Sequence, residues 1–289
     1  MPDRTTLLIQ YRALQATVRA GLGKPEVTAA LVSLLEEAKA FLAENCSRAA
    51  MNSGVPGKQY FTFTDGARTS RPVNADLFKA EIDPSALAEL AAAAQGPPDS
   101  LLLRQSLYSW VLTFCAANDV LFVSDQKKPG TFFEWFVGHL LARRYRTSPR
   151  KFTEVASLGM NTRIPTDFVF DLGAGKARIH LPVKTSTRER AIQVWAHQRV
   201  LDGLHGQNTF RGILVCVAET NKQVQANSVI EVCVPEQWRL YQGYIAQLHR
   251  VYYLDPPAAY LSLGAGSPQI PVKHFSEFFS ESDRIVSLA

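Results

Sequence analysis

Hydrophobic residues recur at helical spacing through most of the first 120 residues of the chain. In the segment 5–45, Gly21 and Pro25 interrupt this pattern, and we therefore predict two helices there. An Ala-rich helix is predicted over 83–95, and a mostly buried one over 101–117. Four helices thus account for most of this part of the chain.

The segment between these helices has a different composition. Residues 46–75 are rich in Gly, Ser, Asn and Pro and contain a short alternating run at 60–64. This pattern predicts a hairpin or an exposed loop. We therefore expect residues 1–120 to form a mainly helical N-terminal region.

The hydrophobic pattern changes after residue 130, where short apolar runs alternate with helical ones. The predicted order is helix, hairpin, helix and strand, followed by further strands, which describes a mixed sheet with helices on both faces. This α/β region is predicted to span residues 121–289, with a core and a C-terminal extension. Its elements are a helix at 131–145, strands at 164–171 and 177–183, a helix at 188–203, and strands at 212–218, 229–234 and 251–254.

Composition and charge narrow the function. The chain has 289 residues, a net charge of +5 and a pI near 9.0, and its basic residues are concentrated between Arg143 and Arg211. This distribution suits a polyanionic partner such as double-stranded DNA but does not establish one. No apolar run is long enough to span a membrane, and charges interrupt the first residues where a signal peptide would be apolar. A cytoplasmic protein without a membrane partner is expected.

Candidate chemistry begins with the predicted hairpin. Asp167 lies near the start of its first strand, and Lys184 follows its second strand seventeen residues later, so that the two ends can place a carboxylate beside an ammonium group. A metal-dependent phosphodiesterase needs these groups, because the carboxylate holds magnesium and the lysine acts on the attacking water. A turn aspartate and a strand-end lysine without catalytic function are the alternative interpretation.

The residues after the lysine supply a more specific pattern. Arg188, Glu189 and Arg190 lie four, five and six residues after Lys184. The run 183–190 resembles the catalytic and recognition motif of the EcoRII and NgoMIV group of type II restriction endonucleases, which belong to the PD-(D/E)xK superfamily. Independently of that resemblance, Arg can donate two hydrogen bonds to guanine and Glu can accept one from cytosine. A solvated helix start is the alternative.

In the resembling enzymes a second metal-binding carboxylate often lies on the following helix, and the present sequence departs from that pattern. Two residues before the lysine stands Pro182, and the matching helix position is Gln198. Gln198 shares a helix face with Val194 and Leu201, so that its amide is expected to point inward. Its neutral carbonyl is a weaker magnesium ligand than a carboxylate, and a hydrogen-bonded helix amide is the alternative.

Glu134 is the candidate for the missing acid. It lies among four aromatic residues in the segment 130–138, where a carboxylate is costly to bury unless it meets a cation. We therefore predict Asp167 and Glu134 as the metal ligands, with Asp171 as a more distant alternative. No histidine-based metal site is predicted, because the spacings of His139, His180, His197 and His205 are not those of a metal motif.

The resemblance covers about residues 130–220 and implies a function. The implied enzyme is a magnesium-dependent type II restriction endonuclease that cuts duplex DNA at a short palindromic site of the CCGG type. It would act as a homodimer or a higher homo-oligomer, because two-fold symmetric proteins read palindromes. Two alternatives remain: a DNA-binding protein on a decayed nuclease fold, which Pro182 and Gln198 would explain, and a repair nuclease that recognises DNA structure.

Overall fold

The computed structural model describes residues 3–93, 96–122, 125, 127–157 and 160–287, which fall into two compact units. The predicted division at residue 120 lies inside the first unit. The first unit consists of Met1–Ala94, Asp99–Arg143 and Thr220–Val232, and the second of Gln95–Pro98, Arg144–Glu219 and Cys233–Ala289.

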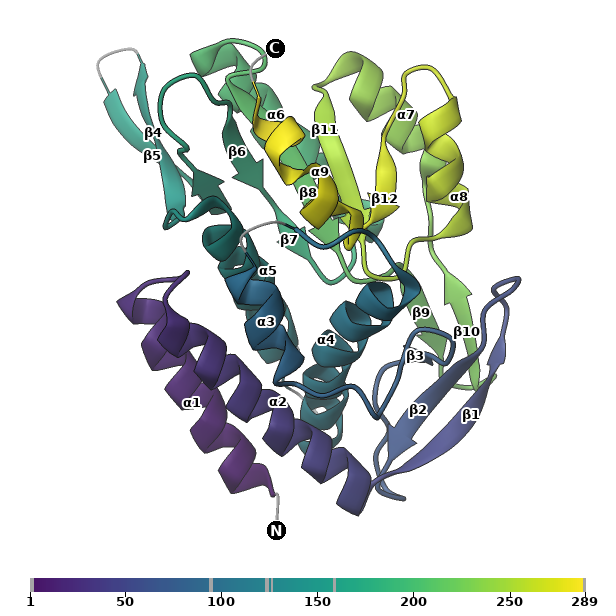
Figure 1. Cartoon of the computed structure of the whole chain (residues 1–289). Helices are drawn as coiled ribbons and strands as arrows, with labels where there is room; N and C mark the ends of the chain where they lie inside the picture. The colour runs from purple at the N-terminus through teal and green to yellow at the C-terminus, as the bar shows by residue number, and fades with distance from the viewer. Residues whose placement is uncertain (1–2, 94–95, 123–124, 126, 158–159, 288–289) are drawn as a thin grey trace. The chain divides into compact units, whose positions relative to one another are not determined.

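Helices dominate the first unit, and all four helices predicted for residues 5–117 are observed (Figure 1). The carboxylate of Asp3 caps the first helix by accepting a hydrogen bond of 2.8 Å from the Thr6 amide. Gly21 and Gly23, with φ of 132° and 88°, form the break between the first two helices. The helices are α1 (Arg4–Ala20), α2 (Pro25–Asn45), α3 (Ala86–Ala92), α4 (Leu101–Leu121) and α5 (Lys127–Tyr145), whose last two residues belong to the second unit.

The first unit also contains a five-stranded sheet, in the order β3-β2-β1-β10-β9. The predicted hairpin around 60–64 is confirmed, because β1 and β2 are antiparallel neighbours. The strand predicted at 229–234 is observed as β10, but it pairs with β1 in this sheet, although the sequence placed it in the second domain. The strands are β1 (Ser47–Ser53), β2 (Tyr60–Thr64), β3 (Val73–Asn74), β9 (Thr220–Gln223) and β10 (Ser228–Glu231).

The second unit is built on a seven-stranded mixed sheet, in the order β12-β11-β8-β6-β5-β4, with β7 also pairing with β8. The predicted hairpin is present as the antiparallel pair β5 and β6, whereas β6, β7 and β11 run parallel to β8. The strands are β4 (Arg150–Ser157), β5 (Met160–Phe170), β6 (Arg178–Leu181), β7 (Val183–Lys184), β8 (Phe210–Cys216), β11 (Leu248–Tyr253) and β12 (Val272–His274).

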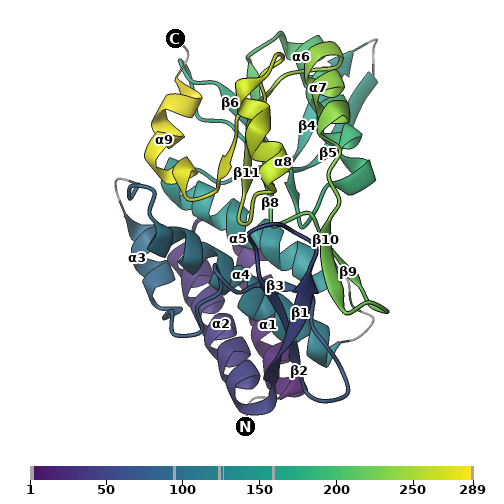
Figure 2. The ribbon, with the colours of Figure 1, turned by 90° about the vertical axis from the view of Figure 1, so that its right-hand side faces the viewer.

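Helices cover both faces of this sheet (Figure 2). Tyr252 and Tyr253 are neighbours on β11 and point to opposite faces: Tyr252 contacts Phe278 of α9, and Tyr253 lies against Trp238 of α7. The predicted α/β class, with a mixed sheet between helices, is confirmed. No helix in the described part of the chain is both long and apolar enough to cross a membrane. The helical segments are η1 (Arg188–Arg190), α6 (Ile192–His205), α7 (Pro235–Tyr244), α8 (Ala258–Leu261), η2 (Ser262–Ala265) and α9 (Glu277–Val286).

Candidate active site

The hairpin places Asp167 and Lys184 in contact. The Lys184 Nζ atom donates a hydrogen bond of 2.7 Å to Oδ2 of Asp167, and the Val183 amide donates a second one of 2.8 Å to the same oxygen. The expected meeting of carboxylate and ammonium at the hairpin ends is therefore observed. Both side chains keep access to solvent, with 19% of Asp167 and 39% of Lys184 exposed.

These two side chains line a small cavity of about 170 Å³ between the hairpin and α6. Among the described residues, Asp167 is the only acidic one that lines it, and two histidines line it as well. Their rings, those of His180 and His197, are 6.3 Å apart. The lining residues are Pro165, Thr166, Asp167, His180, Pro182, Lys184, Gln193, Val194 and His197.

Strand register explains why His180 belongs to this cavity. His180 is the cross-strand partner of Val169, and Asp167 lies two residues before Val169 on the same strand. Cross-strand partners share a face of the sheet, as do residues two apart, so that His180 and Asp167 lie on the same face. Burial lowers the pKa of His180 to about 4, although the hydrogen bond with Gln198 opposes this shift. The ring is therefore neutral at pH 7.

Gln198 is buried with its amide directed inward, as its helix face predicted. Its Nε2 atom donates hydrogen bonds of 2.9 Å to the Phe210 carbonyl and to Oδ1 of Asp202, and its Oε1 atom lies 3.1 Å from Nδ1 of His180. The cavity lining includes His180 but not Gln198. A direct part for Gln198 in the chemistry stays a prediction.

The proposed recognition residues form η1, a single 3₁₀ turn at the start of α6. Arg188 is partly buried and has a φ of 41°, in the left-handed region, whereas Arg190 is exposed. The backbone of Glu189 lies in the same turn, and its side chain is outside the described part of the chain. The roles of all three in base recognition stay predictions.

Glu219 holds this turn in place and was not identified from the sequence. It is fully buried in the link between β8 and β9. Its carboxylate accepts hydrogen bonds of 2.9 Å from the Thr187 amide, 2.6 Å from the Thr187 hydroxyl and 3.1 Å from the Arg188 amide. The Tyr253 hydroxyl donates another, at 2.7 Å. One buried acid therefore anchors the start of the Arg-Glu-Arg segment.

Glu134 lies on α5 in the first unit, half-buried between two buried aromatic residues, Phe133 and Trp135. Burial, and after it the negative charges of Asp125 and Glu134, raises the pKa of the Tyr11 hydroxyl to about 12. Glu134 is thus near Tyr11, within the helical core. Its assignment as a metal ligand stays a prediction.

The metal-coordinating atoms in the cavity suit a hard divalent cation, part of whose coordination shell consists of water molecules. The Oδ2 atom of Asp167 accepts hydrogen bonds from Lys184 and from the Val183 amide. Its other oxygen, Oδ1, accepts no hydrogen bond from the described residues. No group of three His, Cys, Asp or Glu side chains converges on a common point in the described ranges. Magnesium commonly needs only one or two protein carboxylates, with water and substrate phosphate completing its shell.

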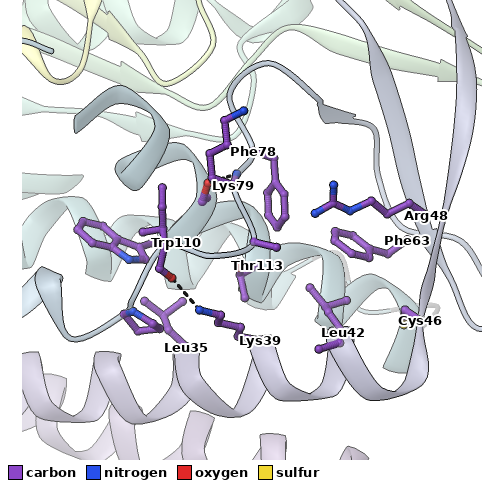
Figure 3. Close-up of a pocket in the computed structure, with 15 residues that line it drawn as sticks. Leu35, Lys39, Leu42, Cys46, Arg48, Phe63, Phe78, Lys79, Trp110 and Thr113 are labelled. Atoms are coloured by element: carbon purple, nitrogen blue, oxygen red, sulfur yellow. Dashed lines mark hydrogen bonds between the residues drawn. The ribbon is translucent and has the colours of Figure 1, made fainter. Parts of the chain in front are cut away.

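A second cavity, of about 180 Å³, lies in the first unit (Figure 3). Its walls are mainly apolar, and Lys39 at its edge donates a hydrogen bond of 3.0 Å to the Ile82 carbonyl. The Arg48 guanidinium lies 4.7 Å above the Phe61 ring. The described residues that line this cavity include no acidic side chain to hold a metal ion.

Comparison with known proteins finds a similar solved structure but no similar sequence family. No family model matches the chain, and no curated protein matches it. The type IIP restriction endonuclease Kpn2I is 25% identical, with a TM-score of 0.81 over 96% of each chain. The restriction endonuclease PspGI, solved with substrate DNA, is 12% identical over 70% of this chain and 88% of its own, with a TM-score of only 0.40. The similarity to Kpn2I shows that the chain has the fold of a type II restriction endonuclease.

Proposed function

We propose that the protein is a magnesium-dependent type II restriction endonuclease that hydrolyses phosphodiester bonds in duplex DNA. The observation that carries this proposal is the contact of 2.7 Å between Asp167 and Lys184, at the edge of a cavity that is open to solvent. The similarity to Kpn2I over nearly the whole chain supports the same function.

In this proposal each side chain of the cavity has a separate task. Asp167 would hold the metal ion through its carboxylate. When bound, magnesium supplies positive charge to the scissile phosphate and acidifies a water molecule. Lys184, already held beside Asp167, would orient the attacking water and, in its neutral amine form, accept the proton that this water loses.

Sequence specificity is assigned to the turn η1. Arg188 and Arg190 would each donate two hydrogen bonds to a guanine, and Glu189 would accept one from a cytosine. This combination suits a G/C-containing site, and the resemblance to the EcoRII and NgoMIV group suggests a CCGG-type core. A palindromic site would be read by a homodimer or a higher homo-oligomer, in which each copy cuts one strand.

Incubation of the purified protein with plasmid DNA and magnesium tests this function. Discrete fragments that require magnesium are expected, and sequencing their ends gives the recognition site. Tight specific binding without cleavage would instead support a DNA-binding protein on a decayed nuclease fold. Cleavage confined to branched or damaged substrates would support a repair nuclease. Either outcome would overturn the proposal.

A further inference from the structure

In the part of the chain that the structure describes, the cavity beside Lys184 is lined by one acidic residue, Asp167, and by the buried imidazole of His180, which lies on the same face of the sheet. We propose that His180 is a nitrogen ligand of the divalent cation, bound through its Nε2 atom together with Oδ1 of Asp167. Gln198 is the positioning residue that orients the ring. This inference rests on the proposed function and adds a histidine to its metal site.

Hydrogen bonding determines which ring nitrogen is available. The Nε2 group of Gln198 is directed at two acceptors, the Phe210 carbonyl and Asp202, so that its Oε1 atom must be the one facing His180. An amide oxygen only accepts, and Nδ1 of His180 therefore carries the proton. In a neutral imidazole the lone pair then lies on Nε2, as required of a metal ligand.

The arrangement has the form of a supported metal ligand. Metal-binding histidines normally donate their other ring N–H group to a carboxylate, a carbonyl or water, which fixes the tautomer and the ring orientation. Here Gln198 is that acceptor and is itself held at 2.9 Å by Phe210 and Asp202. Gly212 leaves room for it, because a Cβ atom at residue 212 would lie 2.6 Å from Oε1 of Gln198.

The positions of Asp167 and His180 permit a shared ion. Val169 is the partner of His180, so that Asp167 and His180 are diagonal neighbours on one face of the hairpin. Such neighbours have Cα atoms about 7–8 Å apart, a distance that two side chains can bridge through a metal.

The proposed ligand set predicts a preference among metals. Imidazole binds manganese and cobalt better than magnesium, which strongly favours oxygen ligands. The metal-free protein should therefore bind Mn²⁺ more tightly than Mg²⁺. The substitution His180→Asn should reduce the ratio of Mn²⁺ affinity to Mg²⁺ affinity. The Asn side-chain amide can still donate a hydrogen bond to Gln198, but it has no equivalent of the Nε2 atom to bind the metal.

The test is pulsed electron paramagnetic resonance of Mn²⁺ bound to the wild-type protein, which detects a directly bound nitrogen without a mutation or a substrate. A ¹⁴N coupling should be present in wild type and absent in His180→Asn. Calorimetric titration should show Mn²⁺ affinity reduced at least about tenfold in that variant. The matched control is His197→Asn, the other histidine of the cavity, which should keep both signal and affinity.

Absence of the nitrogen coupling in wild type would overturn the inference, as would its persistence in His180→Asn or its loss in His197→Asn alone. These outcomes are separate from a failure of the proposed function. If the protein cuts DNA at discrete sites with magnesium but gives no nitrogen coupling, the nuclease assignment stands and His180 is not a ligand. If the wild-type protein cuts no DNA, the nuclease assignment fails even though a metal is bound.

Discussion

Lys184 is the side chain whose removal most directly tests the chemistry, because its ammonium group contacts the one carboxylate of the cavity. Lys184→Ala should abolish cleavage and leave specific DNA binding within about tenfold, since the lysine acts mainly on the attacking water. Asp167→Ala should also abolish cleavage and should remove the metal dependence of binding. Cleavage rates and DNA affinities of both variants, with and without magnesium, provide the measurement.

An exposed lysine on the same hairpin provides the control. Lys176 lies in the turn between β5 and β6 and does not line the cavity. Lys176→Ala should keep the wild-type cleavage rate. If Lys184→Ala or Asp167→Ala cuts at the normal rate, the catalytic assignment of the hairpin is wrong.

The two arginines of η1 provide a second test at the residue scale. Each of Arg188→Ala and Arg190→Ala should reduce discrimination between the recognition site and a site with one changed G:C pair by about 1–3 kcal/mol. Competition binding with matched oligonucleotides measures this difference. An equal loss of affinity for specific and random DNA would mark an arginine as a phosphate contact instead.

The sequence predicted the contact between Asp167 and Lys184 but missed His180 and Glu219, for identifiable reasons. Asp167 and Lys184 were found because a hairpin necessarily brings its ends together. His180 was discounted because histidine metal motifs assume two ligands on one element, whereas strand alternation was the signal that placed it beside Asp167. Glu219 is thirty-one residues from its partner Arg188, and its only signal was an acid at the end of a fully apolar strand.

At the scale of elements, Glu219 connects the end of β8 to the turn η1, and changing it should loosen that turn. Glu219→Gln would place an NH₂ group where the Thr187 and Arg188 amides need acceptors. We expect a loss of about 1–3 kcal/mol in the free energy of unfolding. We also expect discrimination between related DNA sites to weaken more than the cleavage rate on the preferred site.

Tyr253→Phe is the matched control for this variant, because it removes one hydrogen bond from the same carboxylate without touching the turn. It should lower stability but preserve discrimination. If both variants lose discrimination equally, the effect of Glu219 is general destabilisation and not positioning of η1.

The attachment of α9 to the sheet predicts a specific acid sensitivity. Burial alone would raise the pKa of Glu281, but hydrogen bonds from Lys273, Tyr252 and Arg250 outweigh it and hold the pKa at about 2. A carboxyl group with a lowered pKa stabilises the fold when the pH is above 4.5, the pKa of the group in the unfolded chain. This stabilisation is lost as the pH falls toward 2.

The expected contribution is about 3 kcal/mol at neutral pH. Denaturant unfolding of wild type and Glu281→Gln between pH 2.5 and 7 measures it. The two proteins should differ most at pH 7 and converge at the acid end. A constant difference across this range would contradict the assignment.

Helices and strands were predicted correctly where regularly spaced buried residues dominate the sequence pattern. Prediction failed for a strand that carries many charged residues, and it did not show which sheet a strand joins. The helices of residues 5–117 and the apolar strand β8 were found because their spacing is regular. Strand β4 was missed because Arg150–Ser157 carries Arg, Lys and Glu residues that obscure its alternation. The run at 229–234 was recognised as a strand, but an alternating pattern does not specify which sheet it joins, and β10 pairs with β1.

At the scale of the whole molecule, the first unit depends on residues far along the chain. Its sheet uses β9 and β10 from Thr220–Val232, and Val229 completes a small apolar cluster with Met51, Val55 and Tyr60. A fragment of residues 1–143 should therefore have a lower free energy of unfolding than the same fragment with 220–232 joined by a flexible linker. Thermal unfolding of the two fragments measures this, and equal midpoints would contradict it.

The parallel pairing of β1 with β10 also has a consequence for how the protein is made. On the ribosome β1 emerges early, but residues 54–227 must be translated before its partner β10 exists. Elongation at about 5–20 residues per second leaves that strand edge open for about ten seconds or more. An unpaired strand edge can form hydrogen bonds with another chain. The nascent protein is therefore prone to aggregate with other copies of itself during this period. Slower translation would lengthen that period, and co-expressed chaperones should therefore raise the yield of folded protein.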